Sequence, residues 1–376
     1  MTGSVAVVGG GIAGIQAAID LADSGFKTYL IESRPSIGGV MAQLDRTFPT
    51  NDCAMCILSP KLVEAARHPS IELLSYSDVK SIIGTAGDFK VKVVKKARYV
   101  DESKCVGDGV CVEKCPVKVP DEYNAGMGTR KAIYIPFGQA IPRVATIDTT
   151  SCFHLTKGKC GICKKICEPK AVDFEQEDKE IELSVGSVIL ATGFRPYDPA
   201  SLTRQYKFGH PDVITSLQLE RSLCPSGPTQ GQVVKPSDGK APKKIGFIQC
   251  VGSRNATANR KYCSSVCCMS ATKEAMIAKE HDPELDITIF HIDLRSFGKN
   301  FEEFYNRARK EYGIKYINSR PPEVIVDANN SLSIRYELSA VDELRTEPFD
   351  LVVLSIGLDP SDSTRNVAQA SGIALD

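Results

Sequence analysis

The chain has 376 residues, 42% of them hydrophobic and 24% charged, which is enough for two or three globular domains. A formal net charge of zero gives no support for binding to nucleic acid or to an anionic membrane, and no apolar run approaches the roughly 18 residues that span a bilayer. Because the N-terminus also lacks the order of a signal peptide, the fourteen cysteines indicate reduced thiolates in a cytoplasmic protein rather than disulfides.

The first predicted element is a βαβ unit. An apolar run over Ser4–Val8 predicts a buried parallel strand, a helix rich in Ala, Ile and Leu runs to about Ser24, and a second strand over Lys27–Ile31 ends at Glu32. The turn between them has the G-x-G-x-x-G spacing, with the candidate phosphate-binding residues Gly9, Gly11, Ile12, Ala13 and Gly14. Its glycines let the backbone approach a pyrophosphate at the helix N-terminus, and Glu32 can accept a hydrogen bond from a ribose hydroxyl. The combination favours dinucleotide binding over a purely structural turn.

The later elements continue the α/β alternation, which a cysteine-rich insert interrupts from near Ala97 to Lys170–Phe174. Further strands are predicted over Ile71–Leu74, Phe89–Val94, Ile181–Val185, Ser187–Leu190, Lys244–Gln249, Ile287–Ile292 and Leu351–Ser355. Helices are predicted over about Ser265–Glu280 and Phe301–Tyr312. The segment Cys224–Lys244, rich in Pro, Gly, Ser and Lys, is typical of an interdomain linker.

The insert carries two runs of cysteines that are spaced as in two-cluster ferredoxins. In those proteins the thiolates follow C-x2-C-x2-C-x3-C, and each fourth cysteine ligates the other cluster. This crossover rule assigns one cluster to Cys105, Cys111 and Cys167 and the other to Cys115, Cys152, Cys160 and Cys163. The long gap before Cys160 predicts that Phe153–Lys159 is looped out. A zinc ribbon is the alternative, but its paired knuckles do not explain the C-x3-C-P ending of the first run.

One position of the insert departs from the ferredoxin pattern. Asp108 stands where the motif normally has a cysteine. A carboxylate can ligate iron through oxygen, as a harder and more exchangeable ligand. We therefore expect either a four-iron cluster with Asp108 as a ligand or a cluster that loses iron at that corner and becomes a three-iron form.

The C-terminal half carries a second set of cysteines, Cys250, Cys263, Cys267 and Cys268. They follow the strand after which a nicotinamide-binding domain would carry its own glycine fingerprint. The turn there reads Gln-Cys-Val-Gly-Ser-Arg, so we expect no NAD site. The spacings of 13, 4 and 1 match no ordinary ferredoxin, and on spacing alone a cluster and a set of partly buried thiols both remain open.

Several segments resemble known flavoproteins. The first glycine turn with Glu32, the pair Gly38-Gly39 and the strand end Ala191-Thr192-Gly193 are similar to the thioredoxin-reductase superfamily. The stretches IGGVMAQL, FPTNDCAMCI, IPFGQAIP and FIQCVGSR resemble the A subunit of heterodisulfide reductase. This second resemblance covers essentially the whole chain.

The resemblance to heterodisulfide reductase implies FAD and about three 4Fe–4S clusters, one of them held by the second cysteine set close to the flavin. It also implies an α/β fold with two dinucleotide-binding-type, thioredoxin-reductase-like domains and an inserted two-cluster ferredoxin domain. The implied domains are 1–96 and 173–225 for FAD binding, 97–172 for the insert, 226–243 for the linker and 244–376 for a second dinucleotide-type domain with a cluster in place of NAD. The further implied flavin contacts are Gly38, Gly39, Met41, Val79, Ala191, Thr192 and Gly193.

Some single residues gain a role only through the resemblance. Lys273 is implied as the candidate catalytic residue, approaching flavin N5, where a cation favours the anionic reduced flavin. Without the family argument it would be a solvated lysine. Cys53 and Cys56 form a C-x-x-C motif, for which a thioredoxin-like dithiol, half of a cluster and contact with a partner's cluster all remain open. Cys224 is expected to be a plain residue.

The chain differs from that family in its extent. Members commonly carry an additional N-terminal cluster module and a C-terminal ferredoxin module, which are missing here. The late Gly-Asp segment that contacts the flavin ribityl chain in the superfamily is also not evident. We therefore expect either a truncated chain or a flavin site that another chain completes.

The resemblance implies a flavin and iron–sulfur electron-transfer subunit of a heterodisulfide reductase-type complex, which can split an electron pair by bifurcation. The implied partners are the B- and C-type subunits, a hydrogenase or formate dehydrogenase module and ferredoxin, with paired copies of this chain in the assembly. One alternative is an NAD(P)H-dependent oxidoreductase resembling the glutamate synthase small subunit, which would need a second glycine fingerprint. The other is a cluster-binding relay or scaffold subunit without flavin, which the missing FAD segment favours.

Overall fold

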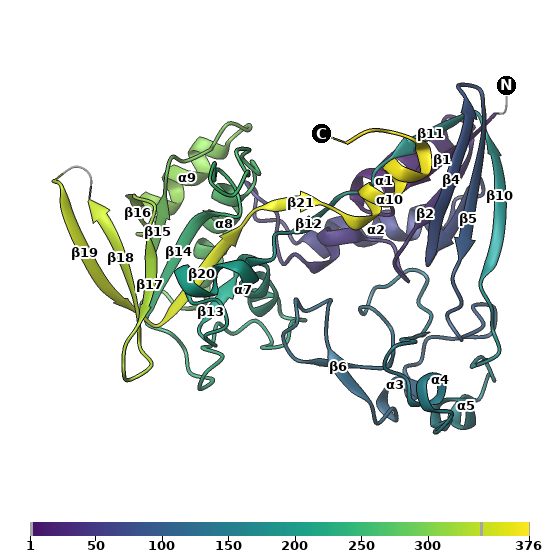
Figure 1. Cartoon of the computed structure of the whole chain (residues 1–376), viewed down its shortest axis with the longest axis horizontal. Coiled ribbons are helices and arrows are strands. Elements are labelled where there is room, and N and C mark those ends of the chain that lie inside the picture. The colour runs from purple at the N-terminus through teal and green to yellow at the C-terminus, as the bar shows by residue number, and fades with distance from the viewer. Residues whose placement is uncertain (1–2, 339–340, 376) are drawn as a thin grey trace. The chain divides into compact units, whose positions relative to one another are not determined.

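The computed structural model describes residues 3–338 and 341–375. The chain divides into two compact units (Figure 1), of which unit 1 comprises residues 1–42, 55–194 and 360–376, and unit 2 comprises residues 43–54 and 195–359. The short strands β12 (Phe194–Pro196) and β21 (Leu358–Pro360) pair with each other where the chain passes between the units. In the described ranges, no helix is long and apolar enough to cross a bilayer.

A parallel sheet of order β11-β1-β2-β3 forms the centre of unit 1. Its strands are β1 (Ser4–Val8), β2 (Lys27–Glu32), β3 (Ile71–Ser75) and β11 (Ser187–Leu190). All five residues of β1 are buried, as expected for a strand covered on both faces. Val5 and Val7 pack with Ile15 and Ile19 of helix α1 (Ile12–Asp23), so the apolar stripe of the helix fixes its N-terminus at the carboxyl edge of the sheet.

The opposite face of this sheet is covered by an antiparallel sheet of order β10-β5-β4. Its strands are β4 (Ser77–Thr85), β5 (Asp88–Lys95) and β10 (Lys179–Val185). The remaining elements are the 3-10 turn η1 (Gly39–Gln43), α2 (Ala54–Arg67) and α10 (Asp362–Ser371), and α10 packs against β4. The sequence patterns did not predict α2, in which Pro60 lies inside the helix.

The cysteine-rich insert has little regular structure (Figure 1). Its elements are α3 (Val110–Glu113), β6 (Lys118–Pro120), β7 (Thr129–Lys131), β8 (Ile133–Tyr134), β9 (Thr146–Ile147), α4 (Phe153–Lys157) and α5 (Ile162–Ile166). A bridge between Val100 and Val172 closes its base, and the cysteines pack around a small apolar core that includes Ile133 and Ile147. A core of this size is typical of small units that a metal site holds together.

Unit 2 is built on a parallel sheet of order β13-β20-β14-β15-β16. The strands are β13 (Val213–Thr215), β14 (Lys244–Val251), β15 (Asp286–His291), β16 (Lys315–Asn318) and β20 (Leu351–Ile356). Its helices are η2 (Pro199–Leu202), α6 (Thr203–Tyr206), α7 (Ser216–Leu223), α8 (Cys267–His281) and α9 (Phe301–Lys310). A second, antiparallel sheet consists of β17 (Glu323–Val326), β18 (Leu332–Leu338) and β19 (Glu343–Phe349).

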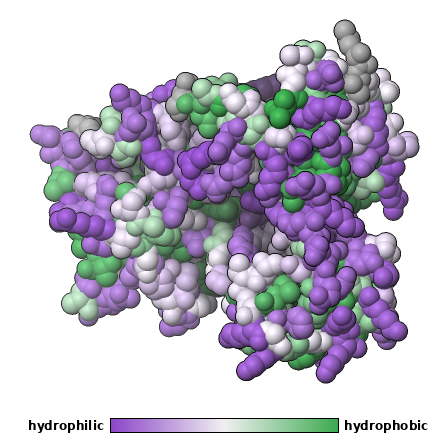
Figure 2. Space-filling model, turned by 45° about the vertical axis from the view of Figure 1, so that its right-hand side comes forward, coloured by the Kyte–Doolittle hydropathy of each residue, from purple (hydrophilic) through white to green (hydrophobic). Residues whose placement is uncertain are grey.

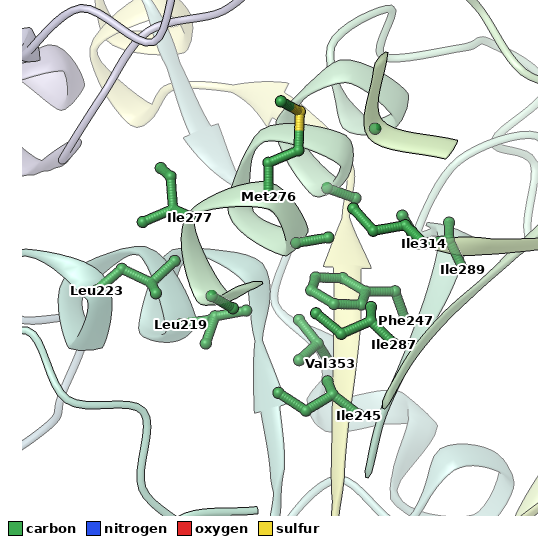
Figure 3. Close-up of a cluster of buried hydrophobic side chains, with 14 of the residues drawn as sticks. Leu219, Leu223, Ile245, Phe247, Met276, Ile277, Ile287, Ile289, Ile314 and Val353 are labelled. Atoms are coloured by element: carbon green, nitrogen blue, oxygen red, sulfur yellow. The ribbon is translucent and has the colours of Figure 1, made fainter. Parts of the chain in front are cut away.

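The largest apolar cluster of unit 2 fixes helix α8 on the parallel sheet. Figure 3 shows Met276 and Ile277 of α8 above Phe247 of β14, with Leu219 and Leu223 of α7 beside them. Burying each such side chain contributes roughly 1.5–3 kcal/mol. The helix that carries Cys267 and Cys268 at its start is therefore held rigidly.

The strands and helices expected from the sequence are confirmed to within two residues at each end. Helix α8 begins at Cys267 rather than Ser265, because Ser265 has a left-handed φ of 65° that a helix cannot include. The chain's division differs from the predicted domains in several respects. Residues 43–54 and 195–225, assigned from the sequence to the FAD-binding domain, lie in unit 2, where β13 pairs with β20. The predicted linker 226–243 also lies inside unit 2, and residues 360–376, assigned to the second domain, lie in unit 1.

Candidate functional site

The turn after β1 has no room for side chains. Gly9 has a φ of 114°, and a Cβ there would lie 2.1 Å from the carbonyl oxygen of Ala191. A Cβ on Gly14 would lie 1.8 Å from the carbonyl oxygen of Gly9. Both glycines are therefore required for the tight turn and for the close packing of α1 against the sheet.

The start of helix α1 is open to an anion. Gly11 occupies the N-cap and supplies no side-chain hydrogen bond, and both Ile12 and Ala13 are exposed. The first N–H groups of a helix have no partner within the helix, and this helix is 12 residues long. Backbone donors and the positive end of the helix dipole thus converge where a pyrophosphate would lie.

Glu32 is anchored at the end of β2. Its Oε2 accepts a hydrogen bond from Gly10 N at 2.7 Å and its Oε1 accepts one from Arg34 N at 2.7 Å. The residue is only 7% exposed. Its hydrogen bonds hold the glycine turn in place, a role that the sequence did not predict. Oε1 also accepts a hydrogen bond from the Ser33 hydroxyl at 3.2 Å, whereas Oε2 keeps a second lone pair. The hydrogen bond from a ribose hydroxyl stays a prediction.

A second glycine pair lies against the first turn. Gly38 N donates to Gly10 O at 2.7 Å, and a Cβ on Gly39 would lie 2.9 Å from the Cα of Gly11. Gly38 and Gly39 have φ values of 128° and 58°, which favour glycine. The two turns therefore form one cradle lined by backbone.

The other predicted flavin contacts of this region lie in apolar surroundings. Met41 is on η1, directly after the second glycine pair, and packs partly buried against the core of unit 1. Val79 is 8% exposed and packs in the apolar core with Val91 and Val93. The structure gives Val79 a packing role, and its predicted contact with flavin stays untested.

The strand end Ala191-Thr192-Gly193 lies at the same edge of the sheet. Ala191 N donates to Val8 O at 2.7 Å, and Gly193 has a φ of 66°. The carbonyl oxygen of Thr192 accepts a hydrogen bond from the Ser361 hydroxyl, which also caps helix α10. Dinucleotides bind at the carboxyl edge of such parallel sheets, and this edge carries all the predicted FAD residues except Val79 and Met41.

One cavity of the insert is lined by four cysteines, Cys115, Cys152, Cys160 and Cys163. This is the group that the crossover rule assigned to one cluster. Burial, together with the neighbouring thiols, raises the pKa of Cys163 to about 11. The segment Phe153–Lys159, predicted to be looped out between Cys152 and Cys160, contains the short helix α4.

The other insert cysteines gather around Cys111. Burial raises the pKa of its thiol to about 12, and the nearby groups Cys105, Cys163, Asp108 and Cys167 raise it further. Asp108 is exposed, and its Oδ1 accepts a hydrogen bond from Val110 N at 3.2 Å, at the start of α3. The carboxylate therefore lies beside the thiols, and its role as an iron ligand stays a prediction.

The four cysteines of unit 2 also line one cavity, together with Ser253, Arg254, Ser265, Asp293 and Arg295. Cys267 and Cys268 lie in the first turn of the 15-residue helix α8, whose positive end favours thiolates. Burial raises the pKa of Cys267 to about 12 and that of Cys268 to about 11, so iron would displace protons on binding. Cys250 has a left-handed φ of 61°, which turns the chain into the cavity.

Positive side chains lie beside this cavity. Arg254 pairs with Asp293, and Arg295 Nη2 lies 3.2 Å from the same carboxylate. Arg320 Nη1 donates to the carbonyl oxygen of Arg254 at 3.0 Å. Burial raises the pKa of the Cys250 thiol, and the charges of Arg254 and Arg320 oppose that rise. Three guanidinium groups and one carboxylate would thus surround a negatively charged cluster.

Lys273 is buried in unit 2, with 1% of its surface exposed. Its Nζ pairs with Glu220 and donates to the carbonyl oxygen of Arg46 at 3.0 Å. The alternative of a solvated lysine is therefore wrong. Glu220 is also 1% exposed, and its other oxygen accepts a hydrogen bond from Asp45 N at 2.7 Å. The predicted approach of Lys273 to flavin stays untested.

Glu274 is a second buried carboxyl group next to this pair. Burial raises the pKa of Glu274 well above its ordinary value, and the charge of Glu220 raises it further. Its Oε1 accepts a hydrogen bond from the Ser270 hydroxyl at 2.9 Å. A neutral carboxyl, a carboxylate and an ammonium group therefore share the space between α7 and α8. Neither acid could be recognised from the sequence, because an acid within a helical pattern is normally solvated.

Three cysteines, Cys53, Cys56 and Cys224, lie neither in the two cavities nor in the group around Cys111. Cys53 and Cys56, three positions apart at the start of α2, are joined by a disulfide, so the expectation of reduced thiols throughout is wrong for this pair. The disulfide favours the dithiol interpretation of the C-x-x-C motif. Cys224 is a free, half-buried cysteine whose sulfur lies 3.2 Å from the Ser226 hydroxyl, in keeping with a plain residue.

The donor sets have the sulfur chemistry that iron–sulfur clusters require. In the described part of the chain, no three His, Cys, Asp or Glu side chains lie close enough to chelate one metal ion. A four-iron cube holds its thiolates further apart than one zinc ion does, and it requires soft sulfur donors. Two cavities that are each lined by four cysteines supply such soft donors, and the choice between clusters and a zinc ribbon stays a prediction.

The chain is similar in sequence to A subunits of heterodisulfide reductases. The chain is 49% identical over 369 residues to the A subunit of H(2):CoB-CoM heterodisulfide,ferredoxin reductase from Methanothermobacter marburgensis, covering 98% of this chain and 55% of that protein. It is 48% identical over 374 residues to the iron-sulfur A subunit of CoB–CoM heterodisulfide reductase from Methanocaldococcus jannaschii, covering 99% and 56%. The chain thus spans about half the length of the curated relatives it matches.

A solved structure and a family model also match the chain. The crystal structure of T. acidophilum thioredoxin reductase matches 99% of this chain and 82% of its own, with 16% identity and a TM-score of 0.48. The family model described as pyridine nucleotide-disulphide oxidoreductase matches residues 3–218. The resemblance to the A subunit of heterodisulfide reductase is confirmed, and the chain belongs to the pyridine nucleotide-disulphide oxidoreductase family.

Proposed function

We propose that this chain is the flavin- and iron–sulfur-carrying part of an oxidoreductase of the heterodisulfide reductase type. The observation that carries the proposal is the pair of cavities lined by four cysteines each, one in the insert and one in unit 2. Four thiols from separate segments line each cavity, with His154 beside them in the insert and Asp293 beside them in unit 2. Together with the backbone cradle of unit 1, they support a path for electrons between a dinucleotide cofactor and clusters.

The residues of the chain would have distinct tasks. The first-turn N–H groups of α1 would bind the pyrophosphate of FAD, the glycines would admit it, and Glu32 would orient the ribose. FAD supplies the exchange between two-electron and one-electron transfer, which clusters alone cannot perform. The cysteine sets would hold clusters, and the arginines beside Cys250 would stabilise negative charge there. Lys273, held by Glu220, is the candidate catalytic cation.

The proposed activity extends to an assembly. The name of the M. marburgensis relative includes both a CoB–CoM heterodisulfide and ferredoxin, and we infer the same acceptor classes here. Partners would be the B- and C-type subunits, a hydrogenase or formate dehydrogenase module and ferredoxin, in the cytoplasm and with paired copies of this chain. Electron bifurcation between a disulfide-reducing branch and ferredoxin would follow from a flavin that exchanges electrons with more than one cluster.

Oxygen-free purification, followed by counts of iron, acid-labile sulfide and flavin per chain, tests the proposal. We expect FAD and iron with sulfide, and an electron paramagnetic resonance signal after reduction with dithionite. Zinc, or no metal, would contradict the cluster sites. Rapid bleaching by NADH would favour the NAD(P)H-dependent alternative, and clusters without flavin would favour the relay or scaffold alternative.

Serine variants assign the signals to the cavities. Cys163→Ser and Cys267→Ser should each remove or alter the signal of one cluster, because each takes one thiol from a different cavity. The matched control is Cys224→Ser, at a free cysteine outside both cavities, which should change neither iron content nor spectrum.

Asp108 has its own test. Asp108→Cys should convert a labile or three-iron signal into a stable four-iron signal, because a thiolate replaces a harder oxygen ligand. An unchanged paramagnetic resonance spectrum would count against Asp108 as a ligand.

A further inference from the structure

The rim of the insert cavity exposes apolar side chains. Phe153 at the start of α4 and Ile162 at the start of α5 are each 40% exposed, and both line the cavity of the four cysteines. Cys160, one of those cysteines, is itself exposed. In Figure 2 hydrophobic residues lie among hydrophilic ones on the lower part of unit 1, which the insert forms. A cluster in this cavity would lie directly below an accessible apolar surface.

Lysines surround this rim. Lys157, Lys159, Lys164 and Lys165 are all exposed. The Nζ of Lys157 lies 4.6 Å from the centre of the Phe153 ring. In the ranges that the structure describes, none of the four ammonium groups has a carboxylate partner within ion-pair distance.

The charge around the cavity is locally strong. Between residues 149 and 170 the sequence has five lysines and a single acid, Glu168, although the whole chain has no net charge. The surface next to the other insert cysteines is different. Val106 and Val110 are exposed there too, at 68% and 41%, but Asp108 and Glu113 are exposed beside them. The basic character therefore belongs to the α4–α5 rim.

We propose that the α4–α5 rim is the docking surface for a small acidic one-electron carrier protein of the ferredoxin type. The inference rests on the proposed function and deepens it by naming the contact surface. Opposite charges steer the encounter, and exposed apolar side chains at the centre allow a brief close contact. Interfaces of transient redox partners are small, as a rim formed by two five-residue helices requires.

The electron step at this surface is simple. One electron passes between the cluster at Cys115, Cys152, Cys160 and Cys163 and the carrier, so one centre is oxidised as the other is reduced. No bond forms or breaks, and no proton has to move. The apolar rim excludes water between the two centres.

Stopped-flow mixing of the reduced, cluster-loaded chain with an oxidised plant-type [2Fe–2S] ferredoxin tests the docking surface. The charge-reversal pairs are Lys157→Glu with Lys159→Glu, and Lys164→Glu with Lys165→Glu. Each pair should lower the second-order rate constant at low ionic strength at least about tenfold, because it removes the steering charge. Added salt should slow the wild-type reaction and reduce the difference between variants.

Two controls make the result specific. Lys80→Glu with Lys92→Glu imposes the same change of charge on exposed lysines of β4 and β5, and it should leave the ferredoxin rate unchanged. Cytochrome c, a basic carrier, should react as fast or faster with the α4–α5 variants. If a charge-reversal variant contains less iron than the wild type, the neutral variant Lys164→Gln with Lys165→Gln takes its place. Its rate constant should lie between those of the wild type and the charge-reversal variant.

The outcomes separate the two proposals. A chain without iron and sulfide would contradict the proposed function before docking is tested. A fully loaded chain whose ferredoxin rate is the same in wild type and in both lysine variants would overturn the docking surface alone. An equal loss in the Lys80 and Lys92 control would also overturn it, since net charge rather than the rim would then govern the rate.

Discussion

Removing the charge of Lys273 should destabilise unit 2 strongly. In Lys273→Met a side chain of similar length replaces the ammonium group, so packing between α7 and α8 is kept while Glu220 loses its partner. The side chains of Lys273 and Glu220 are 1% and 2% exposed, so water cannot take over the lost contact. The variant therefore isolates the cost of an unpaired buried carboxylate.

The magnitude follows from the burial of both partners. Removing one member of a buried ion pair costs about 3–5 kcal/mol. A unit of this size loses about 2–4 °C in Tm per kcal/mol, so the expected drop is roughly 6–20 °C. The double variant Lys273→Met with Glu220→Gln leaves no buried charge behind and should recover most of the loss. The loss in the single variant should shrink at acid pH, where a lone buried carboxyl can take up a proton.

Urea unfolding and thermal melts at pH 5 and pH 8 measure these effects. The matched control is Lys310→Met on the surface of α9, which should stay within about 0.5 kcal/mol of wild type. A single variant as stable as the wild type, or a double variant as unstable as the single one, would refute the reasoning. Lys273 would then have a solvated alternative position that the burial does not indicate.

Three further predictions concern the cradle, the buried acid and the arginines. Gly14→Ala should abolish flavin binding, because its Cβ would meet Gly9 O at 1.8 Å, whereas Gly138→Ala, with nothing within 4 Å, should keep the flavin content. Glu274 keeps its proton in the folded chain, whereas in the unfolded chain it loses the proton above the ordinary pKa of 4.5. The free energy of unfolding should therefore fall as the pH rises above 4.5. Glu274→Gln should lack this loss, and its stability relative to wild type should increase from pH 4.5 to pH 8 in urea titrations. Arg254→Gln should shift the midpoint potential of the adjacent cluster to more negative values, by roughly 60 mV for each tenfold fall in the equilibrium constant for reduction. Arg254→Lys should restore part of the lost potential. A redox titration followed by paramagnetic resonance measures both variants.

Local patterns allowed much of the fold to be predicted. The glycines of the first turn, the buried run of β1 and the acid at the end of β2 lie within 30 residues, and their spacing reflects backbone geometry directly. Helix α2 escaped prediction because Pro60 interrupts the usual helical composition. The assignment of residues 195–223 differed, because pairing of β13 with β20 joins segments that are far apart in the sequence.

The candidate site divides in the same way. Cysteine spacing indicated the insert clusters, and the grouping of Cys115 with Cys152, Cys160 and Cys163 followed from the crossover rule. The docking surface could not be predicted, because lysines are common on any surface. Their arrangement around the exposed side chains of Phe153 and Ile162 depends on how α4 and α5 fold over the cavity.

Residues close together along the backbone were enough to predict the glycine turn, the α/β order of elements and the sulfur-rich character of the chain. The burial of Lys273, its pairing with Glu220, which lies 53 residues earlier, and the arginines beside Cys250 became evident only in the folded chain. Burial and charge pairing depend on side chains that folding brings together from distant segments, and no local pattern records those distances.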